Sequence, residues 1–123
     1  MSKRILVVDD IHSNVMLMEA WLQAEGFETS TAFSGAECLD KLASEATDLV
    51  LLDVMMPVMD GTEVCRRIKA NPALASIPVV LLTALNIEAA RDAAAKAGAN
   101  DFLVKPVSDD ALLACLRKHL REP

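Results

Sequence analysis

Aromatic residues are scarce in this sequence, which has no tyrosine, one tryptophan and three phenylalanines among 123 residues. The core must therefore be built from aliphatic side chains, and such a core is typical of strands that are buried on both faces of a parallel sheet. A chain of this length has room for one ordinary domain but not for two. We therefore expect residues 1–123 to form a single domain.

Positive charge is also in short supply, because 12 Lys and Arg stand against 18 Asp and Glu and give a net charge of −6. This balance argues against a surface made for nucleic acid or for an anionic membrane, and it favours a protein partner. No apolar run approaches the roughly 20 residues of a transmembrane helix, and the run Ile5–Val8 is too short for a signal peptide. We expect a cytoplasmic protein that contacts neither nucleic acid nor membrane.

Cysteine is present in an odd number, as Cys38, Cys65 and Cys115, and the three are widely spaced. This spacing offers neither a disulfide framework nor a CxxC metal pair, so each cysteine is expected to be a small core residue. His119 falls near the end of the last predicted helix, where it would face the negative end of the helix dipole, and it needs no other role.

Short apolar runs alternate along the chain with longer segments of helical period. The runs predict strands at residues 5–8, 29–32, 49–52, 79–82 and 102–104. Four residues are expected to cap the intervening and final helices: Ser13, Ser34, Asn86 and Ser108. Strands that alternate with helices predict a (βα)5 fold of the α/β class, with a parallel sheet covered by helices on both faces.

Polar residues follow four of the five predicted strands: Asp9 and Asp10, Asp53, Thr83 and Lys105. Any one of them could be polar simply because a strand ends near water. In a parallel sheet, however, the carboxyl ends of the strands share one edge, and ligands bind at that edge. The joint pattern therefore indicates a functional site.

Three of these residues are acids, and they would share a small volume if the strands at 5–8 and 49–52 are neighbours, about 4.8 Å apart. Like charges at such distances raise one another's pKa values unless a cation compensates them. Mg²⁺ prefers carboxylate oxygens, and its charge together with that of Lys105 would balance the three acids. A bound cation, the amine of Lys105 and the hydroxyl of Thr83 suit phosphoryl transfer, with Asp53 as the nucleophile.

Four segments resemble, in order and spacing, the receiver domains of bacterial two-component response regulators. They are ILVVDD at 5–10, LLDVMMPVMDG at 51–61, IPVVLLTA at 77–84 and GANDFLVKP at 98–106. The resemblance covers essentially the whole chain and implies a single receiver domain over residues 1–123. It also implies a doubly wound, flavodoxin-like sheet of five strands in the order 2-1-3-4-5.

The resemblance implies roles for the acids and for one methionine. Asp53 would be the phosphoacceptor, Asp10 a direct ligand of Mg²⁺ and Asp9 its partner through water. Met55 matches the position whose backbone carbonyl completes the metal site. The side chains of Met55, Met56 and Met59 are expected to fill gaps beneath a loop.

The resemblance also assigns the remaining site residues. Thr83 would be the hydroxyl that moves toward the phosphoryl group, and Lys105 the amine that contacts it. The bond between Lys105 and Pro106 is often cis in the family. Phe102 matches a position whose aromatic side chain turns inward on activation. Phenylalanine could still make this rotation, but it has no hydroxyl with which to hydrogen-bond a partner.

A signalling switch is the function that the resemblance implies. A histidine kinase or a histidine phosphotransfer protein would phosphorylate Asp53 in a Mg²⁺-dependent reaction. The face formed by the fourth helix, the fifth strand and the fifth helix would then change its preference for a downstream protein or output domain, and a homodimer is compatible with this scheme. Such a domain catalyses its own phosphorylation and dephosphorylation and is not a metabolic enzyme.

Three alternatives stay open at this point. A phosphatase of the haloacid dehalogenase type also forms an aspartyl phosphate. Enzymes of that type share a second acid two residues after the nucleophile, and this chain has Met55 at that position. A flavodoxin-like cofactor binder would place a phosphate after the first strand, where Asp9 and Asp10 would repel it. An interaction module that is independent of phosphorylation would not need the site residues, all of which are present.

Overall fold

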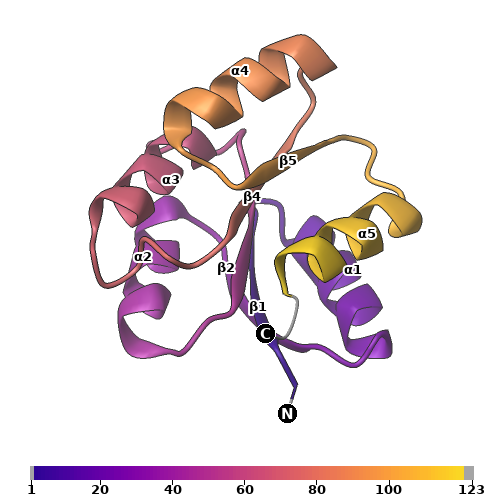
Figure 1. Ribbon diagram of the computed structural model, residues 1–123. Helices are drawn as coiled ribbons and strands as arrows, with labels where there is room; N and C mark the ends of the chain where they lie inside the picture. Colours follow the sequence, from indigo (N-terminus) through magenta and orange to yellow (C-terminus); the bar gives the residue numbers. More distant parts are fainter. Residues whose placement is uncertain (1, 121–123) are drawn as a thin grey trace.

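The computed structural model describes residues 2–120 (Figure 1). Met1 and residues 121–123, which the predicted domain includes, lie outside the described part. The strands are β1 (Arg4–Val8), β2 (Glu28–Ala32), β3 (Leu49–Asp53), β4 (Val79–Thr83) and β5 (Asp101–Val104). The helices are α1 (His12–Ala24), α2 (Gly35–Ser44), α3 (Gly61–Ala70), α4 (Ile87–Ala97) and α5 (Asp109–His119).

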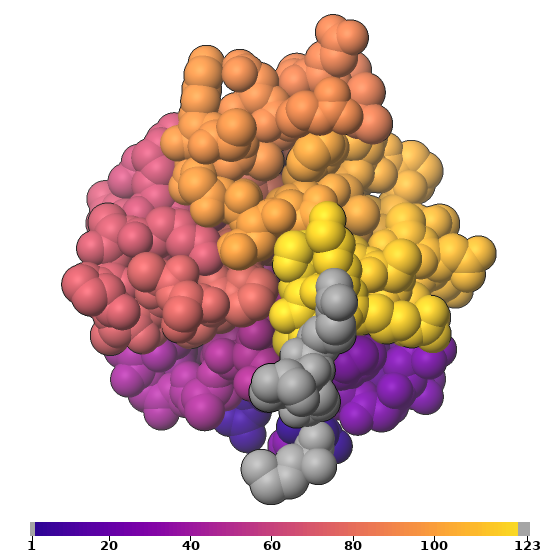
Figure 2. Space-filling model, in the orientation of Figure 1, coloured from indigo at the N-terminus to yellow at the C-terminus, as the bar shows by residue number. Residues whose placement is uncertain are grey.

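All five strands pair in parallel, in the order β2-β1-β3-β4-β5. Helices α1 and α5 cover one face of the sheet, and α2, α3 and α4 cover the other (Figure 1). The predicted (βα)5 fold and its strand order are therefore confirmed. In the space-filling view α5 lies at the surface between α4 and α1 (Figure 2).

The three central strands, β1, β3 and β4, contain continuous apolar runs because both faces of the sheet are covered there. Successive side chains of a strand point to opposite faces. Leu6 and Val8 therefore pack with α2, α3 and α4, whereas Ile5 and Val7 pack with α1 and α5. The three cysteines are buried and free, as expected of core residues.

Helix caps account for the starts of most helices. The side chains of Ser34, Asn86 and Ser108 each accept a hydrogen bond from the amide three residues later, at 2.9–3.1 Å, which confirms three predicted caps. The prediction for Ser13 is wrong, because α1 begins at His12 and its N-cap, Ile11, makes no side-chain bond. The Asp9 carboxylate accepts a bond from the Ile11 amide at 3.0 Å, so the site itself holds this end of the helix.

Within residues 2–120, none of the helices combines the length and the apolar character that crossing a membrane would require.

Candidate functional site

The carboxyl edge of the sheet gathers the polar residues that follow the strands. Asp53 ends β3 and pairs with Leu82 on β4, while Thr83 ends β4 and pairs with Val104 on β5. Asp9 follows β1, which is the other neighbour of β3. The strand order therefore places the phosphoacceptor candidate at the centre of this edge.

Three carboxylates converge there, since Asp9, Asp10 and Asp53 each offer an oxygen within 4.8 Å of the other two. Asp9 and Asp53 are buried, and Asp10 is partly exposed. The Oδ1 atom of Asp10 is buried and has no hydrogen-bond partner among the described residues. A buried, unbonded carboxylate oxygen beside two other acids fits a hard divalent cation such as Mg²⁺.

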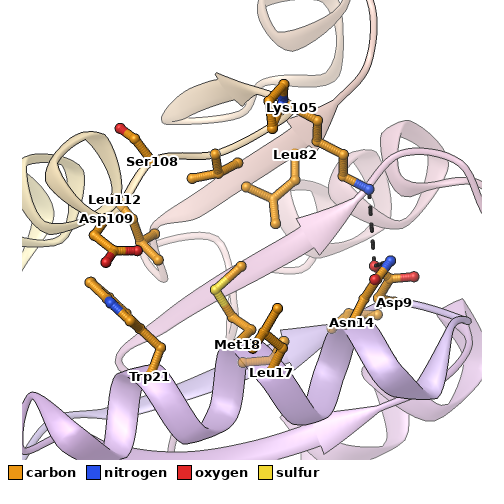
Figure 3. A pocket seen from close by; sticks show the side chains of 14 residues that line it. Asp9, Asn14, Leu17, Met18, Trp21, Leu82, Lys105, Ser108, Asp109 and Leu112 are labelled. Atoms are coloured by element: carbon orange, nitrogen blue, oxygen red, sulfur yellow. Dashed lines mark hydrogen bonds and ion pairs between the residues drawn. The ribbon is translucent and has the colours of Figure 1, made fainter.

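Lys105 supplies the positive charge of the site. Its Nζ forms an ion pair and hydrogen bond with Asp53 Oδ1 and lies 4.0 Å from Asp9 Oδ2. Figure 3 shows the lysine side chain extending from the end of β5 toward Asp9. The peptide bond from Lys105 to Pro106 is cis.

The environment of Asp53 raises its pKa above the ordinary aspartate value. Burial is the main cause, and the negative charges of Asp9 and Asp10 act in the same direction, while the bond from Lys105 opposes them. A cation held between the three acids would favour the ionised carboxylate, which is the nucleophilic form.

Thr83 and Phe102 lie on neighbouring strands. Thr83 is buried, and its hydroxyl oxygen accepts a hydrogen bond from the Leu85 amide at 3.1 Å. The hydroxyl proton remains available for donation. Phe102 is half-buried and packs against the core beneath α2, α3 and α4.

The loop after β3 departs from expectation at one methionine. Met56 is buried and Met59 packs partly buried against the core, but the side chain of Met55 is 74% exposed, so the predicted packing of Met55 is wrong. Its backbone still follows β3 at the site edge. Val58 adopts φ +69°, a conformation that costs a β-branched residue energy.

Sequence reasoning did not single out two residues that support the site. Asn14 donates from Nδ2 to Asp9 Oδ2 at 3.2 Å and helps to orient that carboxylate. Gly61 packs on the backbone of Asp53, where a Cβ atom would come within 2.9 Å of the carbonyl carbon. The Asp-Gly pair at 60–61 was the only sequence signal for Gly61. Such a pair indicates a turn more readily than a close approach between two backbone segments.

An apolar groove opens beside Lys105 and Asp9, between α1 and α5 (Figure 3). Its volume is about 610 Å³, and Leu17, Trp21 and Leu112 are among the side chains that line it. Leu17 is 74% exposed. The groove thus offers an apolar surface that is continuous with the charged site.

Comparisons with known proteins agree on one family. The profile described as response regulator receiver domain matches residues 5–117. Response regulator PleD of Caulobacter vibrioides is 51% identical over 121 residues, a match that covers 98% of this chain and 27% of that protein. The chain thus spans about a quarter of the length of that curated relative.

Solved structures share the whole fold. A putative response regulator from Chloroflexus aurantiacus J-10-fl superposes with a TM-score of 0.93 at 31% identity, over 99% of this chain and 100% of that one. The receiver domain of sensor histidine kinase PA1611 from Pseudomonas aeruginosa PAO1 gives 0.89 at 28% identity, over 99% and 100% of the two chains. That structure is described with a magnesium ion coordinated in its active-site cleft.

Proposed function

Because the chain belongs to the family of response regulator receiver domains, we propose that Asp53 accepts a phosphoryl group from a phosphohistidine. The donor is a histidine kinase or a histidine phosphotransfer protein. Receiver domains of response regulators are signalling proteins, and we assign residues 1–123 to one such domain. The observation that carries the proposal is the convergence of Asp9, Asp10 and Lys105 on the buried Asp53.

The proposed reaction is a transfer between two side chains. A carboxylate oxygen of Asp53 attacks the phosphorus, the bond from phosphorus to the donor's imidazole nitrogen breaks, and the electron pair of that bond stays on the nitrogen. Lys105 Nζ, which already bonds Asp53, would stabilise charge on the phosphoryl oxygens. The Thr83 hydroxyl, at the end of the neighbouring strand, would donate a further hydrogen bond.

Mg²⁺ is the cofactor that the donor set favours. Asp10, Asp53 and the backbone carbonyl of Met55 would hold the ion directly, with Asp9 as a partner through water. The ion supplies positive charge that offsets the charge of the phosphoryl oxygens. The unbonded Asp10 oxygen supports this assignment, because an ion would satisfy it.

The proposed output is a change in the surface made by α4, β5 and α5. Thr83 and Phe102 would follow the new charge and shift the domain between two conformations with different partner preferences. Both residues belong to the strands beside α4 and α5. The partner would be a downstream protein, an output domain or a second copy of the chain.

Intact mass after treatment with acetyl phosphate and Mg²⁺ tests the proposal. We expect wild type to gain an adduct of about 80 Da, the mass of one added phosphoryl group, and Asp53→Asn to gain none. Asp92→Asn is the matched control, because Asp92 is an exposed acid on α4. An adduct that persists in Asp53→Asn would contradict the proposal. So would the lack of an adduct in wild type with both acetyl phosphate and a phosphorylated phosphotransfer protein.

A further inference from the structure

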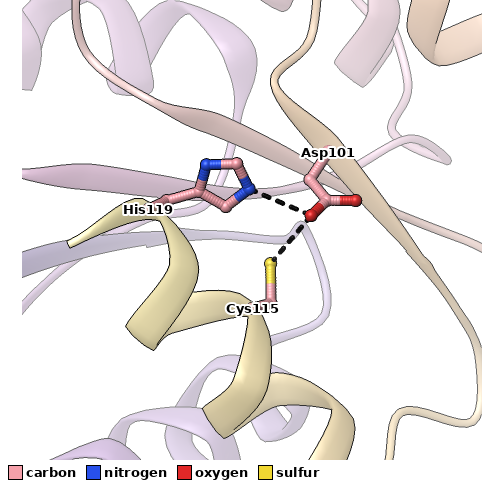
Figure 4. A group of neighbouring side chains, drawn as sticks. All are labelled: Asp101, Cys115 and His119. Carbon is pink, nitrogen blue, oxygen red and sulfur yellow. Dashed lines mark hydrogen bonds and ion pairs between the residues drawn. The ribbon is translucent and has the colours of Figure 1, made fainter. Parts of the chain in front are cut away.

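A second group of metal-ligating side chains lies at the edge of the sheet opposite Asp53. Asp101 is the first residue of β5, whereas Cys115 and His119 lie on α5. Residues four apart share one face of a helix, so the cysteine and the histidine both face the aspartate. Figure 4 shows the three side chains converging from the strand and the helix.

The three donor atoms lie close enough together to share one metal ion. His119 Nε2 lies 2.9 Å and Cys115 Sγ 3.6 Å from the same oxygen, Asp101 Oδ2. All three ligand atoms fall within 4.8 Å of one another. Around zinc, with bonds of about 2.3 Å to sulfur and about 2.0–2.1 Å to nitrogen and oxygen, such atoms lie roughly 3.3–3.6 Å apart.

We propose that Asp101, Cys115 and His119 form a Zn²⁺ site, with water as the fourth ligand. The donor set distinguishes this site from the one at Asp53. Thiolate and imidazole ligands favour zinc, while a site made only of oxygen ligands favours Mg²⁺. The proposal rests on the α5 and β5 residues alone and does not depend on phosphorylation of Asp53.

Without a metal the group holds one ionised acid and one protonated thiol, so zinc must displace a proton to bind the sulfur. Burial, together with the neighbouring carboxylate of Asp101, raises the pKa of the Cys115 thiol to about 12, so the thiol is protonated without a metal. Burial opposes ionisation of Asp101, but hydrogen bonds from His119 and the Phe102 amide lower its pKa, and the carboxylate is ionised. Zinc binding would form the bond to sulfur and release the thiol proton to solvent, while His119 would bind through Nε2 in the tautomer that carries its proton on Nδ1.

The group lies just beneath the surface, with Cys115 buried and its two partners partly exposed. The side chains of His119 and Asp101 are 13% and 25% exposed, so an ion would approach from the side of these two residues. Lys118 Nζ lies 3.9 Å from Asp101 Oδ2, but its side chain is 66% exposed and can turn into solvent. A bound ion would tie the last turn of α5 to the start of β5 and stabilise the folded chain.

Cobalt titration with Mg²⁺ in excess tests the proposal, because a thiolate ligand to Co²⁺ produces a near-ultraviolet charge-transfer band that oxygen ligands do not. We expect wild type to develop this band at one ion per chain and to lose it when Zn²⁺ is added. Cys115→Ser should abolish the band, and His119→Gln should weaken metal binding at least tenfold, in line with the loss of one ligand. Asp53→Asn should leave the charge-transfer band and the metal affinity unchanged.

Matched controls come from the other cysteines and the other histidine. Cys65→Ser and His12→Gln should keep the band, since Cys65 is a buried residue of α3 and His12 lies at the start of α1. Wild type alone gives an independent reading, because Zn²⁺ binding in weak buffer should release at least one proton per ion. A wild-type chain without band or proton release would overturn the proposal and leave the group as an ion pair only. A band that survives in Cys115→Ser would also overturn it.

Discussion

Gly61 packs directly against the backbone of Asp53. A Cβ atom at position 61 would lie 2.9 Å from the carbonyl carbon of Asp53 and 2.9 Å from the Cα of Val54, distances that side chains do not adopt. The Gly61 amide also donates to the Val54 carbonyl at 2.9 Å. The start of α3 and the end of β3 are therefore held together through a contact that only glycine permits.

Gly61→Ala should consequently destabilise the fold and displace Asp53. We expect a loss of about 1–3 kcal/mol in the free energy of unfolding, measured by urea denaturation, because the methyl group forces the backbone apart. Phosphorylation from acetyl phosphate should slow as well. Gly26→Ala separates the two effects, since Gly26 has φ +93° and open space around it. That control should lose stability but keep the phosphorylation rate, and equal rates in both variants would contradict the prediction.

Lys105→Met should slow phosphorylation of Asp53. The lysine bonds the carboxylate and would stabilise the incoming phosphoryl charge, and removal of one such donor costs roughly 10²–10³ in rate. The comparison is Lys96→Met, which removes only an exposed ion pair with Asp92 at 3.2 Å. Rates of adduct formation by intact mass report the difference. A Lys105→Met rate within about twofold of wild type, against the factor expected for a lost donor, would argue against this role.

The acid site was largely predictable because its members directly follow apolar runs. Asp9, Asp53 and Lys105 each stand at the end of a strand, and parallel pairing brings such positions to one edge. The sequence alone therefore determines the edge at which these groups meet. The direction in which each side chain points depends on packing between elements.

The supporting contacts could not be predicted, because they depend on how the helices pack against the strands. Asn14 reaches Asp9 from α1, and Cys115 reaches Asp101 from α5. Nothing in the local spacing states which helix face meets which strand position. The incorrect cap at Ser13 has a related origin, since the Asp9 side chain bonds the Ile11 amide and the helix starts earlier.

Asp60 should make the stability of α3 depend on pH. It is the N-cap of the helix, and hydrogen bonds from Thr62 and the Glu63 amide lower its pKa below the ordinary value of 3.8. The folded state therefore binds the proton less readily than the unfolded state. The stabilisation is present above pH 3.8 and is lost as the pH falls through the lower pKa of the folded chain.

Asp60→Ala should accordingly cost about 0.5–2 kcal/mol at neutral pH, the usual value of a lost cap. Urea denaturation at several pH values should show the deficit shrinking in acid. Asp60→Asn keeps a capping side chain that does not titrate, so it should be nearly neutral at pH 7. An Asp60→Ala deficit that stays constant down to the acid limit of folding would contradict the electrostatic part of this prediction.

Met55 and Leu85 should give the phosphorylated protein a long lifetime. They follow the ends of β3 and β4 by two residues, their side chains are 74% and 45% exposed, and neither apolar side chain can orient a water molecule for attack on the phosphoryl group. Met55→Glu would introduce an acceptor able to position such a water, so we expect the adduct to decay several-fold faster, a modest share of what general base catalysis can supply.

Decay after removal of acetyl phosphate, followed by intact mass, measures this lifetime. Val58→Glu is the matched control, because Val58 lies on the same loop with a fully exposed side chain and adds the same charge. Its decay should stay near that of wild type if water positioning, and not charge, determines the rate. Loss of the wild-type adduct within seconds would show that the apolar flanks do not protect it. Equal acceleration by both glutamates would assign the effect to charge, since repulsion acts at longer range than a bond to one water.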